Sequence, residues 1–336
     1  MIKSLAALTM VAGSVLLHDA SAQTVGTDSG TVVTGEQPAA VSIAKYYGGR
    51  QAAVSLTFDD GLEEHYTLIA PELDRYGLKG TFGINGAVIG DRNDSFAPRM
   101  TWEEVRSLAR NGHEINNHTW SHPNVWEHPE LARRELAMND SAMIAELGYL
   151  ARSVLFPFNA YNDQVLALCD SLYVGARLYQ FGLGQRDTHA TEQSISEWLA
   201  GVTAGGEWGI TMTHGIHTGW DLWDDPAILW NLFRTLSEKS DTVWTSTFAD
   251  VQAYIKERDA TTLTLTHPAK NMMKIEVNCP LPASKFDHPL TLVITGVPAS
   301  GTLKIMQGTT EIPYITTPGG ILVDIDPHTA PVTAAW

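Results

Sequence analysis

The sequence predicts an α/β fold: a distorted (β/α) barrel of about seven strands followed by a small C-terminal all-β domain. Two observations lead to this prediction. From Val41 to Arg258, short apolar runs alternate with amphipathic stretches of helical length, as parallel strands joined by helices require. After Arg258 the helical period ends, and short alternating runs separated by Thr, Pro and Gly replace it.

The first part of the chain consists of strand–helix units. The segment Thr101-Trp102-Glu103-Glu104 is a capping box that should begin one helix, which Gly112 follows at its end. The other expected helices are 63–76, 129–147, 163–172, 192–203, 226–237 and 247–258, and the expected strands are 53–58, 80–85, 113–117, 153–156, 173–177, 209–213 and 242–245. Because parallel barrel strands all end at one end of the barrel, functional groups are expected just after strands.

The last part of the chain has the pattern of half-buried strands. Met273-Lys274-Ile275-Glu276-Val277 alternates apolar and charged residues, and 321–326 does the same. We therefore predict a barrel domain over 41–260 and a β-rich accessory domain over 261–336. Whether that accessory domain binds glycan or covers a barrel edge stays open.

The N-terminus has the pattern of an export signal. Lys3 precedes an apolar stretch from Leu5 to Leu17, and Ala20-Ser21-Ala22 is a small-residue cleavage pattern. We predict a signal peptide over 1–22, a flexible leader over 23–40, and a periplasmic or extracellular location. The alternative for the apolar stretch is a buried N-terminal helix.

Composition excludes some partners. The formal net charge of −16 would repel a phosphate backbone, which disfavours nucleic acid and anionic lipid. No segment after the signal is apolar enough over about 18 residues to span a membrane. The two cysteines, Cys169 and Cys279, fall in different predicted domains, and two separate buried thiols are favoured over one interdomain disulfide.

Three short segments at predicted strand ends carry groups for metal binding or proton transfer. Asp59 and Asp60 precede Gly61, so one carboxylate can bind a metal while the other faces a substrate, although Asp-Asp-Gly is also ordinary turn chemistry. His118 and His122 can converge on one ion from a helical turn or a compact loop, and the alternative is a pair of structural histidines. A third segment, 211–214, ends in a histidine that is a candidate acid.

Together these segments resemble the polysaccharide deacetylases that share the NodB homology domain. That family's first motif is Thr-Phe-Asp-Asp-Gly, which 57–61 match in full. Its second motif is His-Ser/Thr-x-x-His, which 118–122 match in full, and its last is an apolar strand ending in His, which 210–214 match. The resemblance covers about 41–258.

The resemblance implies a role for each group. Asp60, His118 and His122 would bind a divalent ion, with Zn²⁺ expected and Co²⁺ or Ni²⁺ as alternatives. Asp59 would be the general base and His214 the general acid. An acetylated glycan of the chitooligosaccharide, peptidoglycan or acetylxylan type would be the substrate, and either amide or ester acetyl groups would be hydrolysed.

The third family motif, Arg-x-Pro-Tyr/Phe-Gly, is only partly present. Pro157 and Phe158 match it, so the Phe158 N–H is the candidate oxyanion donor. The motif arginine is missing, and Asn159 replaces the glycine, where it should tolerate a left-handed turn. Arg177, at the end of the next predicted strand, could pair with the base instead, and the alternative is an ordinary surface salt bridge.

Tryptophans near the third segment are candidates for sugar stacking. Trp220 and Trp223 lie in a Gly- and Asp-rich loop and are the preferred pair, whereas Trp198 and Trp230 should fill helix packing. His217 is either a supporting group or an alternative acid. Three functions therefore compete: a secreted carbohydrate deacetylase, which is favoured, a metal-dependent amidase for a non-sugar amide, and a carbohydrate-binding relative that has lost activity.

Overall fold

The barrel sheet contains eight parallel strands. The computed structural model describes residues 39–297 and 303–336, so the predicted signal peptide and almost all of the leader lie outside the described residues. The strands are β2 (Ala52–Phe58), β3 (Thr81–Ile84), β4 (Glu114–Asn117), β5 (Ser153–Leu155), β6 (Gly175–Arg177), β7 (Phe181–Gly182), β8 (Trp208–Thr213) and β9 (Val243–Thr245). Their order is β6-β5-β4-β3-β2-β8-β7, with β9 on β2. Because β6 and β7 do not pair, the sheet does not close, and the predicted distorted barrel is confirmed.

Strand β2 is the centre of this sheet. All seven of its residues are buried, as expected for a parallel strand covered on both faces. It pairs with β8 along one edge, and with β3 and β9 at opposite ends of the other edge. The ends of β2 and β8 are in register, with Phe58 opposite Thr213. The residues that directly follow β2 and β8 are therefore close together in space.

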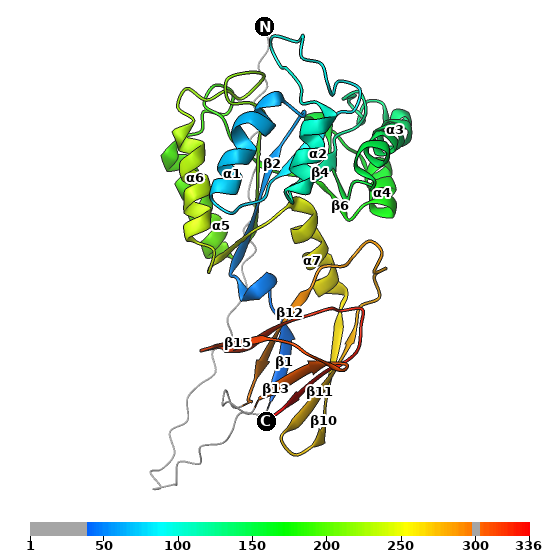
Figure 1. Cartoon of the computed structure of the whole chain (residues 1–336), viewed down its shortest axis with the longest axis vertical. Coiled ribbons are helices and arrows are strands. Elements are labelled where there is room, and N and C mark those ends of the chain that lie inside the picture. Colours follow the sequence, from blue (N-terminus) through cyan, green and yellow to red (C-terminus); the bar gives the residue numbers. More distant parts are fainter. Residues whose placement is uncertain (1–38, 298–302) are drawn as a thin grey trace, which may run out of the picture. The chain divides into compact units, whose positions relative to one another are not determined.

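Helices surround the strands. They are α1 (Ala70–Arg75), α2 (Trp102–Arg110), α3 (Pro129–Leu147), α4 (Asp163–Leu172), α5 (Glu192–Gly205), α6 (Ala227–Glu238) and α7 (Phe248–Ala260). Figure 1 shows α3 beside α4 and α5 beside α6, pairs that are also in contact. The predicted capping box is present, since Thr101 Oγ1 accepts from the Glu104 N–H and the Glu104 carboxylate accepts from the Thr101 N–H. Gly148 ends α3 in the left-handed conformation, at φ 83°.

The helix expected over 63–76 is interrupted. Its first part is a π-turn, His65–Ile69, and regular α-helix begins only at Ala70. Pro71 explains the change, because it has no N–H to donate and its ring crowds the carbonyl four residues earlier. The two-residue strand β7 was not predicted, since it is too short to give a pattern.

The other described residues form two antiparallel sheets, which confirms the predicted all-β character of the C-terminal part. One has the order β1-β12-β16-β15, and the other β10-β11-β17-β13-β14. Their strands are β1 (Ala40–Ile43), β10 (Thr262–Ala269), β11 (Met272–Asn278), β12 (Leu290–Thr295), β13 (Lys304–Gln307), β14 (Thr310–Glu311), β15 (Tyr314–Thr317), β16 (Gly320–Ile325) and β17 (Val332–Ala335). The N-terminal strand β1 pairs with β12 and thus belongs to a sheet built mainly by C-terminal residues. The boundary at 260/261 stays a prediction.

Two further expectations concern the described residues. Cys169 and Cys279 are both free thiols, and Cys169 is buried whereas Cys279 is partly exposed. Within 39–297 and 303–336, none of the helices has the length and apolarity that a membrane span requires.

Candidate metal centre

Five strand ends bring the predicted groups to one end of the barrel. Asp59 and Asp60 follow β2, His118 follows β4, and His214 follows β8. Arg177 is the last residue of β6, and the 3₁₀ turn Pro157–Asn159 comes just after β5. All of these residues except Pro157 line one cavity of about 430 Å³. The parallel topology thus assembles groups that are up to 155 positions apart in the chain, from Asp59 to His214.

The Asp60, His118 and His122 side chains converge. The distance from Asp60 Oδ1 is 3.2 Å to His118 Nε2 and 3.3 Å to His122 Nε2. One ligand atom from each of the three residues lies within 4.8 Å of the others. Asp60 Oδ1 is buried and has no hydrogen-bond partner among the described residues. A buried, unpartnered carboxylate oxygen facing two imidazole nitrogens fits a bound cation.

Hydrogen bonding orients one imidazole, and burial favours the neutral form of the other. His118 Nδ1 donates to the Leu155 carbonyl oxygen at 2.6 Å, which leaves Nε2 as the nitrogen that faces Asp60. Burial, followed by the nearby His118, lowers the pKa of His122 to about 4, which keeps that ring neutral at neutral pH. The pKa of Asp60 is also lowered, because His118 and His122 outweigh the opposing effect of burial. Two imidazoles and one carboxylate are a common zinc ligand set.

The two histidines lie on a compact loop rather than on a helical turn. Thr119 and His122 have φ values of 65° and 59°, in the left-handed region that non-glycine residues rarely adopt. Glu135 of α3 holds this loop, because its carboxylate accepts from the Ser121 N–H at 2.7 Å and from the Ser121 hydroxyl. Asn85 donates to the His118 and Thr119 carbonyls. The strained backbone at the metal ligands is thus fixed by neighbouring elements.

Asp59 is held by Arg177. Arg177 Nη1 donates to Asp59 Oδ1 at 2.9 Å, and Nη2 donates to Oδ2 at 2.6 Å. Nη1 also donates to Thr57 Oγ1 at 2.6 Å. Arg177 is 1% exposed, so this two-point ion pair is not a surface salt bridge. Burial raises the pKa of Asp59, but Arg177 outweighs it and lowers that pKa to about 2, so the carboxylate is ionised.

His214 is paired with a carboxylate that the sequence did not reveal. His214 Nδ1 lies 2.5 Å from Asp221 Oδ2, and the His214 backbone N–H donates to the same oxygen at 3.1 Å. Burial lowers the pKa of His214, but the Asp221 hydrogen bond and the charges of Asp59 and Asp60 outweigh it, so the net shift is upward. A His–Asp pair that favours the protonated ring suits a proton donor. His217 is exposed and does not line the cavity.

The loop after His214 is tied to the loop after Asp60. Glu64, three positions after Gly61, accepts from the backbone N–H groups of 216, 217 and 218 at 2.7, 2.9 and 3.2 Å. His65 Nε2 lies 2.9 Å from the His214 carbonyl oxygen. Burial lowers the pKa of His65 to about 4, so it is a neutral donor. Neither Glu64 nor His65 was predicted to have this role. Two polar residues just after a turn are typical of a solvent-exposed helix N-terminus.

The partly matched third family motif, at Pro157–Asn159, lies against His122. The Phe158 ring meets the His122 ring edge-on at 4.6 Å, and its side chain is 68% exposed. Asn159 has φ 52°, the left-handed turn that the sequence suggested, and Phe158 shares this conformation at φ 59°. The oxyanion role of the Phe158 N–H and the place of Pro157 in it stay predictions.

One predicted stacking residue is wrong. Trp223 is 3% exposed and belongs to the barrel core, where its Nε1–H donates to Thr213 Oγ1 at 3.4 Å, so it cannot stack on a sugar. The loop turns inward between Trp220 and Trp223, which the spacing alone does not reveal. Trp220 is 41% exposed and lines the cavity. Trp198 and Trp230 pack against the core as expected.

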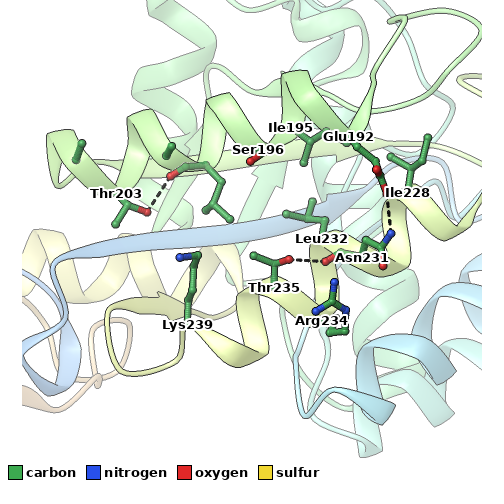
Figure 2. Close-up of a pocket in the computed structure, with 13 residues that line it drawn as sticks. Glu192, Ile195, Ser196, Thr203, Ile228, Asn231, Leu232, Arg234, Thr235 and Lys239 are labelled. Carbon is green, nitrogen blue, oxygen red and sulfur yellow. Dashed lines mark hydrogen bonds between the residues drawn. The ribbon is translucent and has the colours of Figure 1, made fainter.

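A second cavity, of about 500 Å³, lies between α5 and α6 (Figure 2). Several of its polar groups are bonded within the helices or to one another, as in the bond from Asn231 to Glu192 and that from Thr235 to the Asn231 carbonyl. The Asp60 cluster is the metal-ligand group found among the described residues, and it is not in this cavity. The chemistry therefore points to the cavity at the strand ends.

Comparison with known proteins agrees with this site. Residues 47–174 match the sequence model described as "Polysaccharide deacetylase", and this segment contains Asp59, Asp60, His118 and His122 with the contacts described above. Residues 47–174 thus carry the sequence pattern of the polysaccharide deacetylase family. Arg177, His214 and Asp221 lie beyond this matched segment, and their contacts come from the structure.

Three similar proteins illustrate the extent of the likeness. The peptidoglycan-N-acetylglucosamine deacetylase of Bacillus cereus is 32% identical over 118 residues, which cover 34% of this chain and 40% of that protein. A gellan lyase of a Bacillus species is 20% identical over 323 residues, which cover 84% of this chain but 12% of that protein. The solved structure of the peptidoglycan deacetylase PdaC from Bacillus subtilis has a TM-score of 0.46 and 18% identity, and covers 62% of this chain and 94% of that one. The chain thus spans less than half the length of both sequence relatives.

Proposed function

We propose that this protein is a metal-dependent hydrolase that removes acetyl groups from a carbohydrate, of the chitooligosaccharide, peptidoglycan or acetylxylan type. The observation that carries the proposal is the convergence of Asp60, His118 and His122 beside the Arg177-held Asp59 in one cavity. The family match and the named activity of the Bacillus cereus relative support this choice of reaction.

The chain supplies metal ligands, a base, an acid and an oxyanion donor to the reaction. Asp60, His118 and His122 would hold the divalent ion, which we propose to be Zn²⁺. When bound, such an ion lowers the pKa of water and polarises an acetyl carbonyl. Asp59 accepts the proton of the attacking water, since Arg177 keeps it ionised and fixes its orientation. His214 donates a proton to the leaving amine or alcohol, and Asp221 keeps it protonated for that step. The Phe158 N–H is the proposed donor to the oxyanion.

Acetate release tests this function. The full chain, purified with Zn²⁺, is incubated with N-acetylchitooligosaccharides, peptidoglycan fragments and acetylated xylooligosaccharides, with and without a chelator. We expect acetate from at least one of these substrates, loss of release with the chelator, and recovery on adding Zn²⁺. Metal-loaded protein that releases acetate from none of them would contradict the proposal and favour a non-sugar amidase or a binding protein.

The pH profile should report the His214–Asp221 pair. His214 must be protonated to act as an acid, so kcat/KM falls as pH rises through its pKa. Asp221 raises that pKa, and Asp221→Asn should therefore move the alkaline limb of the profile to lower pH. The change is measured as kcat/KM against pH with the best substrate from the screen. An alkaline limb that stays in place in Asp221→Asn would exclude His214 as the titrating acid.

We also propose that the protein is exported, with cleavage after Ala22. The charged start, apolar run and Ala-x-Ala pattern support it. Mature protein recovered from the periplasm or medium should begin at Gln23. Recovery there with Met1–Ala22 still attached would contradict the cleavage.

A further inference from the structure

An exposed aromatic pair lies next to the proposed acid. Phe96 and Trp220 are 52% and 41% exposed, and their rings meet edge to face at 5.1 Å and 84°. The Trp220 ring lies 5.5 Å from the ring of His214. Trp220 lines the cavity that holds the metal ligands, whereas Phe96 does not, so the pair extends an apolar surface beyond that cavity. None of the four family motifs described above includes Phe96 or Trp220.

The pair is held rigidly from both sides. The Phe96 carbonyl accepts from the Gly219 N–H at 2.6 Å, which joins the two loops directly. Asp94 fixes the Phe96 turn, because its Oδ1 accepts from the N–H groups of Phe96 and Ala97 at 2.9 and 3.2 Å. On the other loop, the Trp220 carbonyl accepts from the Gly215 N–H at 3.2 Å. Aromatic rings fixed in advance lose little entropy when a ligand binds.

Arg99 supports the pair from the metal side. Its guanidinium carbon lies 5.9 Å from the centre of the Trp220 ring, and its Nη1 donates to the Asp60 carbonyl. The Arg99 side chain is 11% exposed, so it is a buried support. The aromatic surface is thus connected to the metal ligand Asp60 through Arg99, and through the Trp220 loop to His214.

We propose that Phe96 and Trp220 form a stacking subsite for a pyranose ring, the sugar unit next to the one whose acetyl group reaches the metal centre. The inference rests on the proposed function and assigns a binding position to the neighbouring sugar unit of that substrate. The apolar faces of pyranose rings pack on exposed aromatic rings, and hydroxyl groups at the ring edge stay in water. An aromatic surface continuous with a hydrolytic cavity, in a protein with net charge −16, suits a neutral polymer.

The test compares long and short substrates in the Zn²⁺-loaded full chain. Phe96→Ala is the main variant, because Phe96 does not line the cavity that holds the metal ligands and His214. We expect it to raise KM for the N-acetylglucosamine pentamer about 10-fold, with kcat unchanged and with no effect on the N-acetylglucosamine monomer. Trp126→Ala is the matched control, since Trp126 is 60% exposed but does not line the cavity, and it should change neither constant.

A binding measurement separates this inference from the proposed function. Calorimetric titration of the pentamer into Asp59→Asn protein should give a Kd that Phe96→Ala weakens about 10-fold. If the wild-type chain releases no acetate, the proposed function fails, and the titration still decides the subsite. Unchanged KM and Kd in Phe96→Ala, an equal effect of Trp126→Ala, or no pentamer binding would each overturn the subsite. Phe96→Leu keeps the apolar volume without the ring and gives the same readout if Phe96→Ala unfolds.

Discussion

Replacing Asp59 with asparagine should lower kcat by about 10²- to 10⁴-fold while the metal stays bound. Asparagine has nearly the shape of aspartate, but its amide cannot take a proton from water. The metal ligands Asp60, His118 and His122 are unchanged by the substitution, so the Kd for Zn²⁺ should stay close to that of the wild type. The measurements are acetate release under saturating substrate and Zn²⁺ competition with a chromophoric chelator.

The same substitution should also lower Tm. Arg177 is 1% exposed and loses its counter-charge in Asp59→Asn, and an unpaired buried charge is destabilising. Rates are therefore compared at a temperature where both proteins are folded. Asp241→Asn serves as a control for removing one carboxylate, because Asp241 is exposed and does not line the cavity. A near-normal kcat in folded Asp59→Asn would show that another group is the base.

His118→Ala should weaken Zn²⁺ binding by at least about 10-fold and reduce acetate release accordingly. His118 is 1% exposed, its Nε2 lies 3.2 Å from Asp60 Oδ1, and Leu155 orients the ring. Alanine removes one of three protein ligands and leaves Asp60 with a single imidazole opposite it. The affinity is measured by titrating metal-free protein with Zn²⁺ in the presence of a competing chelator.

His128→Ala is the matched control for His118→Ala. His128 lies in the same part of the chain, but its side chain is 58% exposed and pairs with Glu130 at 3.4 Å. The His128→Ala substitution should therefore leave the Kd for Zn²⁺ unchanged. Equal affinities of wild type and His118→Ala would place the metal elsewhere.

Much of the metal centre could be predicted because it depends on topology. Asp60 and His118 each follow a strand of one parallel sheet, and the carboxyl ends of such strands meet at one end of the barrel. The four-residue spacing of His118 and His122 is then enough to predict that both imidazoles bind the same ion. The sequence did not decide between a helical turn and a loop here, because the loop depends on left-handed backbone at Thr119 and on Glu135 from α3.

The partners of the base and the acid were harder to predict. Arg177 was an open candidate, since its reach to Asp59 depends on how β6 lies in the sheet relative to β2. Asp221 follows His214 by seven positions in an irregular loop. Such a loop has no hydrophobic periodicity from which the direction of a side chain could be predicted. The same loop made Trp223 look exposed, although it turns into the core. Loop side chains are set by long-range contacts, which sequence pattern does not record.

The most direct test of the account is X-ray diffraction at the zinc absorption edge from crystals of the Zn²⁺-loaded protein. We predict one anomalous peak about 2.0–2.2 Å from Asp60 Oδ1, His118 Nε2 and His122 Nε2 together, with the Asp59 carboxylate beside it and still paired with Arg177. A peak at a different cluster, or a fully loaded protein with no peak at these three atoms, would contradict it.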